Sequence, residues 1–147
     1  MKRNSEFRKE FKEKLKLWRR FIDDCGGVYH GEGFAIFFSV LSDHFNHFDL
    51  QLTHKSSNVS LKILVIEVYV ENNQFHTREF RKVAVSNSYV KFGSAHSTHC
   101  FKDIVKSQLT LLHFLCSKNS DFLNAVEKLR ERCLNSGYDE RMVSSAS

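Results

Sequence analysis

Two adjacent aspartates set between two apolar segments constrain the fold of this 147-residue chain most strongly. Residues 17–22 are mostly apolar, Asp23 and Asp24 follow them, and a second apolar segment begins at residue 27. This order predicts a β-hairpin of residues 17–22 and 27–30 with both carboxylates at its tip. Neighbouring carboxylates are ligands for hard divalent cations such as Mg²⁺. The alternative interpretation of the same two residues is a solvated acidic turn.

The composition is typical of a globular domain. Hydrophobic residues make up 41% of the chain and charged residues 27%, and a chain of this length can bury a modest core. No apolar run is long enough to span a membrane, and no signal peptide opens the sequence. We therefore expect an intracellular protein, of the nucleus or the cytoplasm, with no membrane partner and with its four cysteines reduced.

Positive charge is concentrated at the amino-terminal end. Residues 1–20 hold nine Lys/Arg and three Glu, a net charge of +6, whereas the other 127 residues hold 13 basic and 14 acidic residues, a net charge of −1. Such a block suits a polyanion, and we expect nucleic acid. The candidates for phosphate contacts are Lys12, Lys16, Arg19, Arg20, Arg78, Arg81 and Lys82. Ordinary solvated surface charge is the alternative for all of them.

Hydrophobic periodicity predicts an α+β chain. The expected helices cover residues 5–18, 32–47 and 98–116, followed by a turn at 117–120 and a last helix that ends at Gly137. Besides the hairpin, the expected strands cover residues 49–54, 61–70 and 74–82, and residues 83–93 are expected to be irregular. Asn72-Asn73 predicts a tight turn between the last two strands, because Asn tolerates positive φ.

Taken in order, these segments resemble the C-terminal half of an animal retroelement reverse transcriptase of the Penelope-like kind. Residues 17–24, Leu-Trp-Arg-Arg-Phe-Ile-Asp-Asp, resemble motif C of the polymerase palm, and the Phe-rich helix after them resembles the helix of motif D. Residues 71–82 resemble the segment that follows the palm. The later matches are Tyr89, Ser94-Ala95-His96, Cys100-Phe101-Lys102, Lys106-Ser107-Gln108-Leu109, Cys116-Ser117, Asp121-Phe122 and Gly137-Tyr138, in the thumb-side region sometimes described as helix-turn-helix.

The resemblance implies a partial palm with its following hairpin over residues 1–93 and a helical thumb-like region over residues 94–147. It implies that Asp23 and Asp24 are catalytic metal ligands in the intact parent, an RNA-directed DNA polymerase that transfers nucleotides with two Mg²⁺ ions along a primer–template. The family supplies a further aspartate from an upstream strand, and only 22 residues precede Asp23. We therefore expect no DNA synthesis by this chain alone, and self-association through exposed palm surface.

Several departures from the family pattern indicate a truncated and degenerate copy. Ile63-Leu64-Val65 stands where the family has Phe-Leu-Asp, so an acid is lost. Val83 and Ser97 stand at usual proline positions, and the chain contains no proline at all.

Two other interpretations remain open. The first is a non-enzymatic, nucleic-acid-binding helix-turn-helix module, although Glu127 and Glu131 offset the positive charge of the second helix. The second is a zinc-binding structural module, with ligands from His96, His99, Cys100 and either His113 or Cys116.

Overall fold

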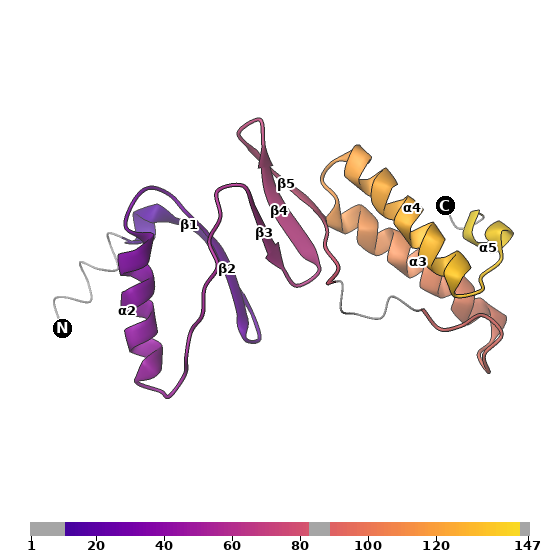
Figure 1. Ribbon diagram of the computed structural model, residues 1–147, viewed down its shortest axis with the longest axis horizontal. Coiled ribbons are helices and arrows are strands. Elements are labelled where there is room, and N and C mark those ends of the chain that lie inside the picture. Colours follow the sequence, from indigo (N-terminus) through magenta and orange to yellow (C-terminus); the bar gives the residue numbers. More distant parts are fainter. Residues whose placement is uncertain (1–10, 83–88, 145–147) are drawn as a thin grey trace. The chain divides into compact units, whose positions relative to one another are not determined.

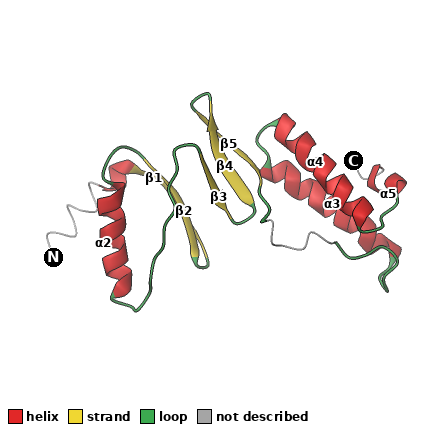
Figure 2. Cartoon of the chain, viewed as in Figure 1, coloured by secondary structure: helices red, strands yellow, loops and turns green. Residues whose placement is uncertain are grey.

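The computed structural model describes residues 11–82 and 89–144, and its architecture is α+β as predicted (Figures 1 and 2). A β-hairpin and a helix come first, three strands follow, and three helices complete the chain. The chain divides into two compact units, residues 1–56 and residues 57–147. This division differs from the predicted boundary after residue 93, because β5 contacts both α3 and α4 and so joins the strands to the helices.

The predicted hairpin is confirmed. β1 (Leu15–Phe21) pairs antiparallel with β2 (Asp24–Tyr29), and the last pair of the ladder is Phe21 with Asp24. Ile22 and Asp23 form the turn between the strands, with a positive φ of 54° at Ile22 but not at Asp23. That pattern is typical of a type II′ turn, in which glycine normally takes the first central position.

An aromatic cluster holds α2 (Phe34–Asn46) against this hairpin. Phe37 of α2 is buried, and its ring centroid lies 5.1 Å from that of Phe11 and 5.8 Å from that of Tyr29. The Trp18 ring meets Phe37 edge-on at 6.2 Å. Phe37 is thus the buried centre of the cluster, and its contacts fix the hairpin on one face of the helix.

Two predictions for residues 1–56 are wrong. The helix expected over residues 5–18 extends only to residue 14 within the described residues, because β1 begins at Leu15 and pairs with β2; residues 5–10 lie outside the described part. The strand expected over residues 49–54 is absent, although Leu50 and Leu52 alternate with polar residues as a strand would. Leu50 is exposed, so the alternation has no buried face to satisfy.

The second unit begins with a three-stranded antiparallel sheet in the order β3-β4-β5. Its strands are β3 (Ser60–Ile63), β4 (Ile66–Glu71) and β5 (Gln74–Glu79). A turn at Leu64-Val65 divides the single strand that was expected over residues 61–70, and Leu64 has a positive φ of 54°. The turn at Asn72-Asn73 is confirmed, with φ of 49° and 61°, as a type I′ turn requires.

Strand alternation gives this sheet one apolar and one polar face. From the pairing register, the mainly apolar face carries Leu61, Ile63, Ile66, Val68, Val70 and Phe75, with Thr77 and Glu79 of β5 on the same side. The polar face carries Ser60, Lys62, Glu67, Tyr69, Glu71, Gln74, His76 and Arg78. Hydrogen bonds and ion pairs join this polar face to the helices, as described below.

The three helices of the second unit share one hydrophobic core. α3 (Thr98–Leu115) and α4 (Asn119–Asn135) lie side by side and antiparallel, and α5 (Glu140–Ser144) packs at one end (Figure 1). The buried residues are Phe101, Val105, Leu112, Ala125, Leu129, Cys133, Tyr138 and Val143. Gly137, with φ of 86°, follows the end of α4, as predicted for a C-terminal glycine.

Candidate nucleic-acid interface and acidic hairpin

The two aspartates lie at the exposed tip of the first hairpin. Asp23 is the second residue of the turn, and Asp24 is the first residue of β2, opposite Phe21. Both are exposed. Arg20 stabilises the turn, because its Nε donates a hydrogen bond of 2.7 Å to the carbonyl oxygen of Ile22. Two carboxylates are thus presented to solvent from a well-defined turn.

The donor set at this tip is not a complete metal site. Carboxylate oxygens are the ligands that Mg²⁺ prefers, and the turn supplies two carboxylates, those of Asp23 and Asp24. Within residues 11–82 and 89–144, however, no group of three or more His, Cys, Asp or Glu side chains gathers where it could hold an ion.

Basic side chains lie along the same hairpin. Lys16, Arg19 and Arg20 are exposed residues of β1, and Lys12 is exposed in the helical residues 11–14. Arg19 Nη1 also donates to the carbonyl oxygen of Trp18 at 3.1 Å. The four amino-terminal candidates for phosphate contact are therefore accessible from solvent.

Arg78, by contrast, is already engaged inside the second unit. Its Nε lies 2.8 Å from Glu67 Oε2, and its guanidinium lies 4.7 Å from the centroid of the Tyr69 ring. Glu67 is buried, and the hydrogen bond from Arg78 holds the pKa of that carboxyl below its ordinary value. These contacts favour a structural role for Arg78.

Arg81 is also engaged, in a network that ties the end of β5 to α3. Its Nε donates to Glu79 Oε1 at 2.6 Å, and its Nη2 donates to Tyr89 Oη at 3.1 Å and to Gln108 Oε1 at 2.9 Å. Arg132 of α4 reaches the same glutamate, with Nη2 3.4 Å from Glu79 Oε2. Of the three predicted phosphate contacts Arg78, Arg81 and Lys82, only Lys82 is exposed and not engaged by the contacts described above.

The connection between α3 and α4 docks on the free edge of β5. The backbone N–H of Ser117 donates to the carbonyl oxygen of Thr77, and the N–H of Thr77 donates to Ser117 Oγ, both at 2.9 Å. Tyr69 Oη donates to Asp121 Oδ2 at 2.5 Å, and this bond raises the pKa of Tyr69 to about 12. Lys118 forms an ion pair with Glu71. The first turn of α4 is thus anchored to the polar face of the sheet.

A polar pocket of about 300 Å³ lies beside this junction. Its lining includes Glu67, Arg78, Glu79, Asp121, Asn124 and Lys128. Groups of opposite charge face one another there, and Glu67, Glu79 and Asp121 already have partners within the fold. These contacts pair the polar side chains of the fold with one another. Because the lining mixes acids and bases, the pocket has no net preference for an anionic or a cationic ligand.

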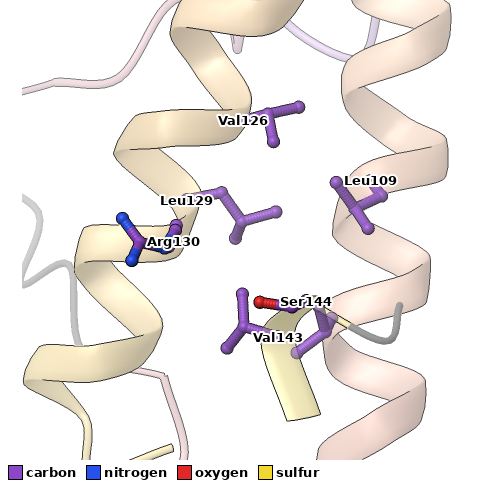
Figure 3. Close-up of a pocket in the computed structure, with 7 residues that line it drawn as sticks. Leu109, Val126, Leu129, Arg130, Val143 and Ser144 are labelled. Carbon is purple, nitrogen blue, oxygen red and sulfur yellow. The ribbon is translucent and has the colours of Figure 1, made fainter. Parts of the chain in front are cut away.

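The space between the helices is a packing gap and not a ligand site. Figure 3 shows Leu109 of α3 and Val126 and Leu129 of α4 directed toward one another, with Val143 of α5 nearby. The cavity has a volume of only about 40 Å³. A cavity of that size holds about one water molecule and is too small for a cofactor.

The two long helices present different charges to solvent. On α4, Arg130 pairs with Glu127 and Glu140, and Arg132 is turned toward Glu79. Its exposed face then carries Glu127, Glu131 and Lys128, so it offers no net positive charge. α3 exposes Lys102 and Lys106, which are separated by one helical turn. These two lysines were not among the residues predicted to contact phosphates, although their i,i+4 spacing is apparent in the sequence.

The proposed zinc ligands do not come together. His96, His99, Cys100, His113 and Cys116 all lie in the described part of the chain, and no metal-holding group of three forms there. His96 Nδ1 is 3.0 Å from Ser94 Oγ, and His99 Nε2 is 3.2 Å from Ser97 Oγ. The zinc-module interpretation therefore receives no support from the geometry.

Comparison with known proteins adds one finding for the helical part. The family model of the animal helix-turn-helix domain matches residues 88–147. This region is similar to a helix-turn-helix domain. The match contains α3, α4 and α5, and it supports the nucleic-acid-binding alternative more directly than it supports the reverse-transcriptase interpretation. No curated protein and no solved structure matches the chain. Among the described helices, none is long and apolar enough to cross a bilayer.

Proposed function

We propose that residues 57–147 form a non-enzymatic nucleic-acid-binding module of the helix-turn-helix class. The observation that carries the proposal is the match over residues 88–147, which coincides with the core of α3, α4 and α5. Residues 116–118 connect the two long helices, a length typical of helix-turn-helix units.

Charge distribution supports the proposal. Residues 57–147 hold 12 Lys/Arg and nine Asp/Glu, a net charge of +3. Ion pairs occupy many of the acids, namely Glu67, Glu71, Glu79, Glu127 and Glu140. The exposed cations that remain include Lys82, Lys91, Lys102, Lys106, Lys128 and Arg141. A polyanion therefore meets a surface whose negative charge is largely neutralised.

The test is binding of the full chain to a labelled 20-nucleotide single strand and a 20-base-pair duplex by fluorescence anisotropy. With about three phosphates neutralised, affinity should fall about 40-fold for the duplex and about 20-fold for the single strand between 50 and 200 mM salt. A control variant with all nine Lys and Arg of residues 1–20 changed to Gln separates the amino-terminal block from residues 57–147. The module is supported if this variant keeps most of the binding, and undetectable or salt-independent binding contradicts it.

As a second candidate, we propose that residues 1–56 derive from the palm of a retroelement reverse transcriptase. The observation in its favour is the hairpin with Asp23 and Asp24 exposed at its tip and backed by the aromatic helix α2. In the intact parent, these carboxylates would hold Mg²⁺ for nucleotide addition on a primer–template; the isolated chain is expected to be inactive. Primer extension with Mg²⁺ or Mn²⁺ tests this, and template-dependent incorporation that is lost in Asp23→Asn would contradict the expected inactivity.

Self-association remains part of this second proposal. Phe21, Ile22 and Ile36 are exposed by 59%, 72% and 66%, respectively. Large apolar side chains in such positions favour association. Sedimentation velocity should show species larger than the monomer; a single monomeric species over a wide concentration range contradicts the expectation.

A further inference from the structure

The helix that would read nucleic acid in a helix-turn-helix is the second one, and here that helix is poorly suited to the task. Arg130 and Arg132 of α4 are held by glutamates, at 3.0 Å from Glu127 and 3.4 Å from Glu79, respectively. Glu131 is exposed on the same helix. Phosphates approaching α4 would meet exposed carboxylates, so the binding surface has to be sought elsewhere in the unit.

The outer face of α3 has the opposite character. His99, Lys102, Lys106 and His113 follow one another at spacings of three, four and seven residues, which places them on one side of a helix. All four are exposed, as is Thr110 between them. Asp103, the one acidic residue of α3, is also exposed and lies on this side of the helix, four residues after His99 and three before Lys106. The two lysines outnumber this single acid, so the face forms a basic stripe along the helix.

An exposed aromatic ring stands at the end of this stripe. The Phe114 side chain is 78% exposed, the highest value among the large hydrophobic residues described. Its ring centroid lies 6.0 Å from that of His113. Lys102 and Phe114 are separated by about 18 Å along the helix axis, from the 1.5 Å rise per residue. That distance matches a few nucleotides of an extended strand.

We propose that the outer face of α3 binds single-stranded nucleic acid, with Lys102 and Lys106 contacting phosphates and Phe114 stacking on a base. This inference rests on the proposed nucleic-acid-binding function and specifies its surface and its ligand. Aromatic side chains bind unpaired bases by stacking, whereas the bases of a duplex are already stacked and inaccessible to Phe114. A basic stripe beside an exposed ring is the combination that single strands require. A protein partner would favour a broader apolar surface, and on this face only Leu111, 38% exposed, accompanies the ring as a large apolar residue.

The aromatic contact is tested in the full chain with fluorescein-labelled (dT)20 and a 20-base-pair duplex at 100 mM salt. Phe114→Leu keeps an apolar side chain but removes the ring, and one lost base stack should weaken (dT)20 binding about tenfold. Duplex binding should change by less than about twofold, because no stack is lost there. The matched control is Leu123→Ala on α4, where an exposed apolar residue is shortened without effect on either probe.

The phosphate contacts have their own matched pair of variants. Lys102→Gln with Lys106→Gln should weaken (dT)20 binding and reduce the slope of log affinity against log salt by about 1.4, from about 0.7 per lost contact to a single strand. Lys128→Gln with Arg141→Gln removes the same charge elsewhere and should change the slope less.

Four outcomes decide the matter. Selective loss of (dT)20 binding in Phe114→Leu supports the inference. Wild-type affinity of Phe114→Leu for (dT)20, or equal losses for strand and duplex, overturns it while leaving the proposed function intact. A change in the sedimentation of Phe114→Leu without nucleic acid, together with unchanged (dT)20 binding, assigns the ring to a protein contact and also overturns it. If the wild-type chain binds neither probe, the proposed function itself fails.

Discussion

Ile22 occupies a turn position that usually belongs to glycine. Its φ of 54° is positive, and a β-branched side chain in this region of backbone space is strained by about 1–3 kcal/mol. Burial of the Ile22 side chain offsets little of this strain, because the side chain is 72% exposed. The hairpin ladder and the hydrogen bond from Arg20 hold the turn in place despite this strain.

Ile22→Gly should therefore stabilise the protein by about 1 kcal/mol, the relief of strain less the greater entropy of glycine in the unfolded chain. Urea denaturation followed by circular dichroism measures the change. Ile22→Ala is the matched control, because alanine removes the branch but keeps the Cβ that opposes positive φ, and it should gain less. An unchanged or lower midpoint for Ile22→Gly would show that the turn is not strained.

Gly27 illustrates a different constraint on a single residue. A Cβ at this position would lie 2.6 Å from the carbonyl oxygen of Leu17 and 2.9 Å from Cε3 of Trp18. The glycine thus allows the Trp18 ring to lie across β2, where it reaches Phe37. Glycine is therefore required at position 27 because β1 and the Trp18 ring approach the backbone closely, and not because the position has a positive φ.

At the scale of elements, the polar face of the sheet β3-β4-β5 holds the sheet and the helices of the second unit together. Glu67 is buried and pairs with Arg78, while Tyr69 and Glu71 hold the start of α4 through Asp121 and Lys118. Burying part of a charged sheet face is costly unless its charges are paired, and here Glu67 pairs with Arg78 and Glu71 with Lys118.

Stability should depend on pH through Glu67. Its hydrogen bond with Arg78 lowers the pKa of Glu67 below the ordinary 4.5 in the folded state. The resulting stabilisation is fully present above pH 4.5 and is lost as the pH falls through the lowered folded-state pKa. Glu67→Gln should flatten the decrease in urea midpoint between pH 5 and pH 3, whereas the exposed control Glu131→Gln should leave it unchanged. Parallel pH profiles for wild type and Glu67→Gln would contradict the assignment.

The elements that the sequence predicted well carry local signals of their own. The Asn72-Asn73 turn supplies two residues that accept positive φ, and α3 has a regular apolar stripe that includes Phe101, Val105 and Leu112. The turn at Leu64-Val65 carries no such signal, because both residues favour strands. Its position is decided by the pairing of β3 with β4, which places Ile63 opposite Ile66.

At the scale of the whole molecule, the second unit depends on the core shared by its three helices. Leu129 of α4 is 1% exposed, and Val105 of α3 and Val143 of α5 belong to the same buried cluster. A cavity of about 40 Å³ already adjoins Leu129, so removing more side-chain volume there would enlarge it.

Leu129→Ala should accordingly destabilise this unit by about 2–5 kcal/mol, the usual cost of truncating a buried leucine. Thermal unfolding followed at 222 nm measures the loss. Leu123→Ala, which shortens a leucine of the same helix that is 57% exposed, should cost about 0.5 kcal/mol or less. Equal effects of the two substitutions would mean that the helices do not pack as described.

Interactions between neighbours along the chain account for the elements that could be predicted from the sequence. Apolar segments on either side of Asp23 and Asp24 produce the hairpin, and 3.6-residue periodicity produces the long helices. Which charged side chains remain available for a partner depends instead on contacts that form when the chain folds. Arg78 is held by Glu67 and Arg132 by Glu79, each from another part of the chain, whereas Lys102 and Lys106 stay on the surface. Such pairing depends on groups that folding brings together, because an ion pair forms between neighbours in space and not in sequence.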